Sequence, residues 1–308
     1  MKIIRNIEQF TSLENTIVTT GTFDGVHLGH QKIFDAMNKL SSETNQKTVV
    51  ITFHPHPRLV LKKEPEKLYL LATIQEKIKL IEKTGIDYLV ILEFNKHLAS
   101  MKPEDFICKI LIKKLGAHTI FVGYDHQFGK GKSGNKETLK EVSCKNNLSV
   151  KEVDVLIKDN KVVSSSIIRE LIIQGKIEEA AEKLGYKYNI TGKVVKGNML
   201  GRKIGFPTAN IECTEKLKLI PARGVYAVRV FINNQWHKGM LNIGFRPTLN
   251  TKKATVEAHV FDLNANLYDE EITIEFIKFL REEIKFDNLQ SLSHQLKKDK
   301  KEALQILG

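Results

Sequence analysis

The chain has 308 residues, too many for one ordinary domain and too few for three, so we expect two domains. Its composition, 42% apolar and 27% charged, is globular and excludes collagen-like, low-complexity and wholly disordered proteins. The 48 Lys and Arg outnumber the 36 Asp and Glu, which gives a net charge of +12. Such a surplus indicates an anionic partner: nucleic acid, an anionic membrane or phosphorylated small molecules.

Cysteine usage and hydropathy indicate a cytoplasmic protein. Cys108, Cys144 and Cys213 are widely spaced and form no Cys-x-x-Cys pair, so we expect neither a disulfide framework nor a zinc site. The opening segment MKIIRNIEQF becomes polar too early for a signal peptide. No uncharged apolar run approaches the roughly 18 residues that a membrane helix needs. We expect no membrane partner, and either a monomer or a weak homo-oligomer.

Strand-like and helix-like segments alternate over residues 1–185. Helices are expected at residues 28–40, after the capping box of Thr73 and Glu76, and between Pro103 and Gly116. The expected strands are residues 16–20, 48–53, 87–92, 118–123 and 148–153. Strands that alternate with helices predict a parallel sheet covered on both faces, an α/β fold.

The pattern changes at residue 186, where we place the boundary between a domain of residues 1–185 and a domain of residues 186–308. The expected strands are now residues 191–195, 225–232, 235–242, 254–261 and 272–279, followed by one amphipathic helix at 289–307. Strands separated by short turns, with a single trailing helix, predict a small all-β barrel domain with a C-terminal helix.

A segment rich in Gly and His follows the first strand and leads into a helix. It reads Gly-Thr-Phe-Asp-Gly-Val-His-Leu-Gly-His over residues 21–30. Its glycines allow a close approach of the backbone to a ligand, and the N-terminus of the helix favours a phosphate. His27 and His30 can donate hydrogen bonds to a phosphate whose charge rises in a transition state. The alternative is a plain glycine-rich connection, but ten residues in this context favour the phosphate site.

A second segment, Ser-Ser-Ser-Ile-Ile-Arg at residues 164–169, begins a helix that ends before Gly175. A helix cap would explain one serine, and Arg169 could be an ordinary solvated residue. Three serines followed by an arginine in the first turn instead indicate a second site for an anion.

With Thr-Phe-His-Pro-His-Pro at residues 52–57, these segments resemble the flavin adenylyltransferase domain of bacterial bifunctional FAD synthetases, within the wider group of His-x-Gly-His nucleotidyltransferases. The resemblance implies a Rossmann-like domain that transfers AMP from ATP to FMN and releases pyrophosphate. The implied catalytic groups are His27, His30 and Arg169, and the implied nucleotide-binding residues are Gly21, Phe23, Asp24, Gly25, Gly29, Ser165 and Ser166. The segment at residues 122–129 resembles the flavin-side loop of the family and implies flavin contacts from Asp125 and Phe128.

A basic, glycine-rich segment opens the second domain, since residues 185–210 contain no acidic residue. Thr208 and Asn210 are two residues apart and therefore share a face if the chain is extended. Their hard oxygen donors suit Mg²⁺ held jointly by the protein and nucleotide phosphates. The segment is not a Walker A motif, and a plain β-turn is an equal alternative on these residues alone.

Glu257 lies in an alternating apolar stretch, residues 255–261. A carboxylate that faces the core is costly, so alternation favours the solvated face of the strand. The functional alternative is a general base at a barrel mouth, placed to orient a substrate hydroxyl.

The segments at residues 201–210, 224–226, 242–248, 257–262 and 280–286 resemble a riboflavin kinase barrel. The resemblance implies a six-stranded barrel in which Glu257 is the base for the 5′-hydroxyl of riboflavin. It also implies nucleotide contacts from Gly201, Gly205 and Pro207, Mg²⁺–ATP contacts from Thr208 and Asn210, and a flavin contact from Arg281. Asp269 stands where the family usually has Gly.

The resemblance thus predicts a bifunctional enzyme. The barrel would convert riboflavin and ATP to FMN, and the α/β domain would convert FMN and a second ATP to FAD and pyrophosphate. Mg²⁺ with ATP is the expected cofactor, while FMN and FAD are intermediate and product rather than prosthetic groups. One alternative is an adenylyltransferase for another acceptor, with the barrel as a passive binding module. The other is a nucleic-acid-binding protein, which we do not expect because only 7% of the residues are aromatic and no recognised motif occurs.

Overall fold

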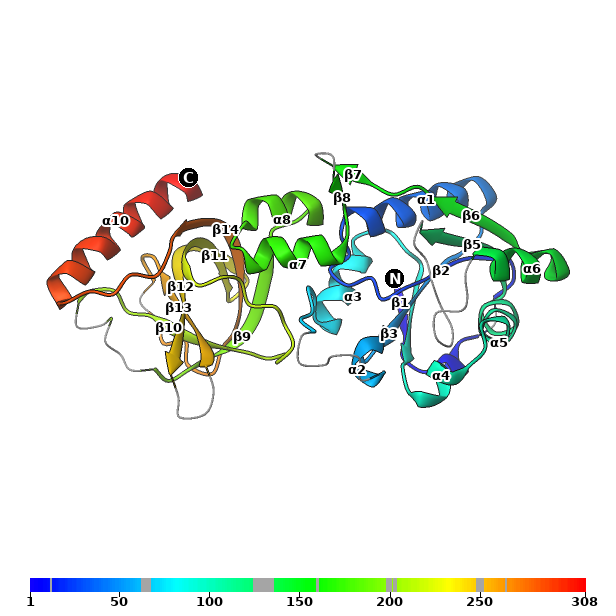
Figure 1. Ribbon diagram of the computed structural model, residues 1–308, viewed down its shortest axis with the longest axis horizontal. Helices are drawn as coiled ribbons and strands as arrows, with labels where there is room; N and C mark the ends of the chain where they lie inside the picture. The colour runs from blue at the N-terminus through cyan, green and yellow to red at the C-terminus, as the bar shows by residue number, and fades with distance from the viewer. Residues whose placement is uncertain are drawn as a thin grey trace. The chain divides into compact units, whose positions relative to one another are not determined.

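The computed structural model describes residues 1–11, 13–61, 68–123, 136–158, 161–197, 201, 204–247, 252–263 and 265–308 (Figure 1). They form two compact units, Met1–Ser165 and Ser166–Gly308. The division falls at the start of helix α7 (Ser165–Ile173), which is followed by α8 (Ile177–Leu184). The boundary that we place between residues 185 and 186 stays a prediction.

The first unit contains a six-stranded sheet in the order β1-β4-β3-β2-β5-β6, and every neighbouring pair is parallel. The strands are β1 (Lys2–Ile4), β2 (Thr16–Thr20), β3 (Thr48–His54), β4 (Tyr88–Glu93), β5 (Ala117–Gly123) and β6 (Ser149–Val153). The prediction of a parallel α/β sheet is confirmed. The short edge strand β1 was not predicted, because three residues are too few to show a period.

Helices cover both faces of this sheet (Figure 1). They are α1 (Leu28–Thr44), α2 (Pro57–Val60), α3 (Ile74–Glu82), α4 (Lys96–Ser100), α5 (Pro103–Asp105), a π-helix (Phe106–Lys114) and α6 (Lys136–Asn146). On β2, Ile17 packs with Phe34 of α1 and Ile78 of α3, whereas the next residue, Val18, packs with Leu111 of the π-helix. The helix expected between Pro103 and Gly116 is present, but most of it is a π-helix.

The strand order reverses at β2, since β3 and β4 lie on one side of it and β5 and β6 on the other. In open parallel sheets, ligands bind outside the carboxyl ends of the strands at such a reversal. The segment of residues 21–30 begins where β2 ends and runs into α1. The topology therefore places this segment at the preferred binding position of the fold.

The second unit is a closed six-stranded barrel in the order β10-β13-β12-β11-β14-β9, with antiparallel pairs throughout. The strands are β9 (Asn189–Val195), β10 (Ala209–Cys213), β11 (Gly224–Ile232), β12 (Gln235–Pro247), β13 (Lys252–Val260) and β14 (Glu271–Arg281). The predicted six-stranded barrel is confirmed. Strand β10 was not predicted as a separate element. Asp269, which stands where the family usually has Gly, adopts a left-handed backbone conformation with φ 69°.

Three helices pack on the outside of the barrel (Figure 1). Residues Ala303 and Leu307 of α10 (Leu289–Leu307) lie in one apolar cluster with Met240 of β12 and Phe261. Helices α7 and α8 contact the barrel side of the unit, where Ala222 N–H donates to the carbonyl of Ile172 at 3.2 Å. The predicted C-terminal helix is confirmed. Among the described residues, no helix combines the length and the apolar character needed to cross a membrane.

Candidate active sites

Two imidazoles stack at the start of α1 in the first unit. His27 is the residue before the helix and His30 lies in its first turn, and their ring centroids are 3.6 Å apart with planes 20° apart. The ring of Phe23 packs edge-on against His30. Burial, followed by the charges of His27 and Lys77, lowers the pKa of His30 well below its usual value. His30 is therefore neutral at pH 7 and can act as a hydrogen-bond donor.

The turn before the helix has an unusual backbone. Phe23, Gly25 and Val26 have φ angles of 45°, 79° and 38°. Such values are unfavourable for Phe and Val, and they persist only where the surroundings fix them. Space is also tight at Gly21, because a Cβ there would lie 3.0 Å from the ring of Phe23. The predicted nucleotide-binding residues thus form one tightly fixed turn.

Asp24 fixes this turn from within. Its carboxylate is 2% exposed and accepts hydrogen bonds from the backbone N–H groups of Leu71 and Ala72, each at 3.1 Å. These two residues lead into α3, so the carboxylate joins the turn to that helix. Its predicted place beside the nucleotide stays a prediction.

The two segments predicted to bind anions meet at Asp24. The hydroxyl of Ser165 donates to the carbonyl oxygen of Asp24 at 2.9 Å. A Cβ on Gly29 would lie 3.2 Å from the ring of His27 and 3.3 Å from the carbonyl oxygen of Val163, so the approach there is close. The structure therefore brings together segments that are more than a hundred positions apart in the sequence, as the 141-residue separation of the bonded pair shows.

For four residues predicted for this site, the contacts with substrate stay predictions. Ser166 and Arg169 lie on α7 in the second unit, and their contact with pyrophosphate stays a prediction. Asp125 and Phe128, predicted to contact flavin, lie outside the described residues.

Strand register builds the polar group of the barrel. Glu257 of β13 lies opposite Asn210 of β10 on one side and opposite Asn242 of β12 on the other. Directly opposite residues in antiparallel strands have Cβ atoms about 4.5–5.5 Å apart. The three side chains therefore form one row across three strands.

This row lies on the outer face of the barrel. Met240 packs against α10, which is outside, and alternation puts Asn242 on the same face of β12. Glu257 is half-buried, and its neighbours Val256 and Ala258 are buried on the opposite face. Glu257 therefore lies on a partly solvated face, and its predicted place at a barrel mouth stays a prediction.

Side chains of this polar row lie very close to the backbone at two glycines, Gly197 and Gly244. A Cβ on Gly197 would lie 2.0 Å from the amide nitrogen of Asn210. A Cβ on Gly244 would lie 2.6 Å from Oε1 of Glu283 and 3.4 Å from the amide nitrogen of Asn242. Glu283 therefore lies next to this polar row. Neither Glu283 nor Asn242 was predicted as a site residue, although both belong to segments that carry the resemblance.

The loop before β10 is closed by backbone hydrogen bonds. The N–H of Phe206 donates to the carbonyl of Gly201 at 2.8 Å, and Gly205 between them has φ 79°. Nδ1 of His259 lies 2.7 Å from the carbonyl oxygen of Pro207, and burial lowers the pKa of His259. This contact fixes the loop directly before Thr208, which is exposed. The predicted nucleotide contacts of Gly201, Gly205 and Pro207 stay predictions.

Arg281 makes a different contact from the one predicted. Its Nε and Nη2 donate to the two carboxylate oxygens of Asp299 at 2.9 and 2.7 Å, and Gln295 donates to the same carboxylate at 2.8 Å. Asp299 is 2% exposed and lies on α10. The guanidinium therefore joins β14 to the helix, and its contact with flavin stays a prediction.

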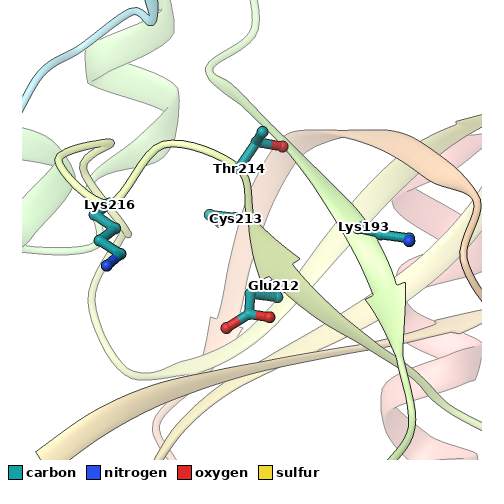
Figure 2. Close-up of a pocket in the computed structure, with 5 residues that line it drawn as sticks. All are labelled: Lys193, Glu212, Cys213, Thr214 and Lys216. Atoms are coloured by element: carbon teal, nitrogen blue, oxygen red, sulfur yellow. The ribbon is translucent and has the colours of Figure 1, made fainter.

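A pocket of about 270 Å³ lies on another part of the barrel surface (Figure 2). Lys193, Glu212, Cys213, Thr214 and Lys216 line it. Lys193, one of these lining residues, pairs with Asp269 at 2.9 Å. None of these lining residues was predicted for a site.

Two family models match the chain in the same order as the two units. The FAD synthetase model matches residues 9–167, and the riboflavin kinase model matches residues 184–307. The chain belongs to the bifunctional riboflavin kinase/FMN adenylyltransferase family. The predicted pair of activities is confirmed at this level, with the FAD synthetase part first and the kinase part second.

Relatives of this family match nearly the whole chain. A bifunctional riboflavin kinase/FMN adenylyltransferase of Buchnera aphidicola is 39% identical over 97% of this chain and 96% of its own. A protein of the same name from Bacillus subtilis is 36% identical over 95% and 93%. A crystal structure from Streptococcus pneumoniae, named as a macrolide-efflux protein, is 31% identical, covers 97% of each chain and has a TM-score of 0.89.

Oxygen donors of the barrel could be shared between the protein and a nucleotide-bound cation. No group of three His, Cys, Asp or Glu side chains placed to hold a metal occurs among the described residues. Thr208 offers a hydroxyl and Asn210 an amide oxygen, with the carboxylate of Glu257 opposite Asn210. This set suits Mg²⁺ only if nucleotide phosphates supply the remaining ligands.

Lys77 is the residue of the first site that sequence reasoning missed. It lies on α3, is 6% exposed, and donates from Nζ to the carbonyl of Thr22 at 2.6 Å. The available signal was its spacing, because Lys77 falls between Ile74 and Ile81 on the apolar face of the helix. A charged residue in an apolar stripe is a reason to look for a buried contact.

Proposed function

We propose that the outer face of the barrel phosphorylates riboflavin with ATP, and that the turn after β2 adenylylates the resulting FMN with a second ATP. The observation that carries the first assignment is the register that puts Glu257 opposite Asn210. The second assignment is supported by the hydrogen bond between Ser165 and Asp24, which joins two anion-binding segments beside the stacked imidazoles.

In the barrel, the nucleophile is a neutral hydroxyl and needs a base. Glu257 accepts the proton of the 5′-hydroxyl as its oxygen attacks the γ-phosphorus of ATP, and ADP leaves. Asn210 and Thr208 hold the nucleotide phosphates together with Mg²⁺, which neutralises their developing charge when bound. The half-buried position of Glu257 keeps its carboxylate accessible to a substrate while Asn210 and Asn242 orient it.

In the α/β unit, the nucleophile is the phosphate of FMN, which is already ionised at pH 7 and needs no base. Its oxygen attacks the α-phosphorus of ATP, and pyrophosphate leaves. His27, His30, the N-terminus of α1 and, by prediction, Ser166 and Arg169 stabilise the charge on the phosphates. Nδ1 of His30 is buried and has no hydrogen-bond partner within the described part of the chain. A phosphate oxygen would satisfy it.

ATP, riboflavin and FMN are accordingly the proposed partners. The use of ATP in both steps supports a cytoplasmic location.

The test is a product assay with two variants and two matched controls. Full-length protein is incubated with riboflavin, ATP and Mg²⁺, and riboflavin, FMN and FAD are separated over time. His30→Ala should stop the reaction at FMN, with FAD formation slowed about 10²- to 10³-fold. Glu257→Gln should slow FMN formation about 10²- to 10⁴-fold yet convert supplied FMN to FAD at the normal rate.

His118→Ala and Glu271→Gln, at exposed positions of the same two units, should leave both steps unchanged. Loss of both activities in either site variant would contradict two separate sites. Absence of FMN and FAD with the unsubstituted protein would contradict the function itself.

A further inference from the structure

Lys77 is a buried cation next to the adenylylation site. Its Nζ donates to the carbonyl oxygen of Thr22 at 2.6 Å and to the hydroxyl oxygen of Thr52 at 3.3 Å. The hydroxyl of Thr52, at the carboxyl end of β3, donates to the same carbonyl at 3.1 Å. Thr22 directly precedes Phe23, where the backbone first takes a left-handed conformation. The ammonium therefore holds the first residue of the unfavourable turn.

Helix α3 fixes the turn at two points. Lys77 binds its entry through the carbonyl of Thr22, and the N–H groups of Leu71 and Ala72 bind its middle through the carboxylate of Asp24. The two anchors have opposite charge, and Asp24 favours the protonated form of Lys77. Because strained turns persist only when their surroundings fix them, removal of either anchor frees the loop that carries His27.

The charge of Lys77 also reaches the imidazoles. Burial lowers the pKa of Lys77 to about 8, so the side chain is mostly protonated at pH 7. The same charge, after burial and His27, lowers the pKa of His30. An apolar side chain of similar length would fill this space without the cost of burying an ammonium. A buried charge beside the reacting groups is more typical of a functional site than of a core.

We infer that Lys77 is a positioning residue for adenylyl transfer: its ammonium holds the turn of residues 22–26 and acts as a fixed positive charge behind the His27–His30 pair. This inference rests on the proposed function of that site. Lys77 acts through the turn and the imidazoles. A displacement of about 1 Å in such a loop lowers the rate of the step by roughly a hundredfold.

The test uses full-length Lys77→Met, with Lys79→Met as the control on the exposed face of the same helix. Conversion of supplied FMN to FAD should fall roughly a hundredfold in Lys77→Met, while riboflavin phosphorylation and both activities of Lys79→Met stay at the normal level. The pKa of His30, followed by NMR of its imidazole, should rise in Lys77→Met because one of the charges that lower it is gone. A merely structural lysine would not move this pKa.

Lys77→Gln serves if Lys77→Met does not fold, since its amide keeps a polar donor on a side chain one methylene shorter while the charge is lost. A folded Lys77 variant with FAD formation within threefold of the unsubstituted protein, or with an unchanged His30 pKa, overturns the inference. The inference is also overturned if the pKa of His30 in the unsubstituted protein has its usual value. This measurement needs no variant. Failure of the unsubstituted protein to form FAD from FMN would instead contradict the proposed function.

Discussion

The two sites assemble their polar groups in different ways. In the α/β unit most of them follow one another along the turn after β2, while Ser165 and Lys77 reach this turn from other segments, and burial lowers the pKa of both His30 and Lys77. In the barrel, Asn210, Glu257 and Asn242 come from three strands and meet only through the register of β13 with its neighbours.

The difference matches the two nucleophiles. FMN brings a charged phosphate, so its site needs donors and fixed positive charge and gains from excluding water. Riboflavin brings a neutral hydroxyl, so its site needs a carboxylate that remains ionised and reachable. A half-buried row on a sheet surface leaves the carboxylate within reach of a substrate.

The largest expected effect tests whether the barrel can be destabilised while the α/β unit keeps its activity. Asp299→Asn leaves the partly buried guanidinium of Arg281 without its charged partner at the buried Asp299 position, so we expect the barrel to lose about 3 kcal/mol of its free energy of unfolding. The single tryptophan, Trp236 of β12, reports barrel unfolding by its fluorescence in urea. Conversion of supplied FMN to FAD in the absence of urea should be unchanged.

Asp262→Asn is the control for this change, because its carboxylate is exposed and only pairs with Lys300 at 3.5 Å. We expect it to cost less than about 1 kcal/mol. A loss of similar size in both variants, or a parallel loss of FAD formation in Asp299→Asn, would contradict the separation of the two units.

A smaller effect tests the dependence of the kinase site on side-chain placement. In Gly197→Ala the new Cβ would overlap the amide of Asn210 at 2.0 Å, so this amide must leave its present position on the strand opposite Glu257. We expect riboflavin phosphorylation to fall roughly a hundredfold, with FAD formation from FMN unchanged. Initial rates of the two steps measure this directly.

Asn210→Ala should cause a loss of the same size, and the double variant should lose little more, because both changes remove one group. Losses that multiply in the double variant would show that Gly197 acts by another route than Asn210.

Much of the fold could be predicted because apolar residues recur at a regular spacing along most of its helices and strands. The inner strands β3, β4 and β5 contain continuous apolar runs, as expected for strands buried on both faces. Strand β10 alternates between apolar and polar residues, but over only five positions beside a glycine-rich segment, which is too short a run to stand out as a strand. The π-helix escaped because its i to i+5 hydrogen bonds leave almost the same apolar pattern as an α-helix.

The sites could be predicted to the extent that their residues are contiguous. His27 and His30 share a helix start, so their spacing alone brings them together. The pairing of Glu257 with Asn210 depends on register, and the contact of Lys77 with Thr22 depends on how α3 packs on the sheet. Neither contact can be predicted from a local sequence pattern. The role of Glu257 was therefore predicted only through the resemblance, and Lys77 was missed.

The smallest expected effect lies at the amino end of the parallel sheet, far along the strands from the first site. Asp87 accepts hydrogen bonds from the N–H and the hydroxyl of Thr48, each at 3.0 Å, and pairs with Lys47 at 3.1 Å. Burial alone would raise the pKa of Asp87, but these contacts hold it below its usual value. Asp87→Asn should cost about 1 kcal/mol at pH 7 and leave both activities unchanged.

The sign of the pH dependence follows from this lowered pKa. The unfolded chain binds the proton more tightly, so the contribution of Asp87 is complete above about pH 4 and is lost as the pH falls through the folded value. Urea unfolding at pH 7 and at pH 3 should therefore show a gap between Asp87→Asn and the unsubstituted protein that narrows in acid. Asp105→Asn, an exposed partner of Lys109, should show almost no gap at either pH. A gap for Asp87→Asn that persists at pH 3 would mean that shape, and not the charge of the carboxylate, joins β3 to β4 at this end of the sheet.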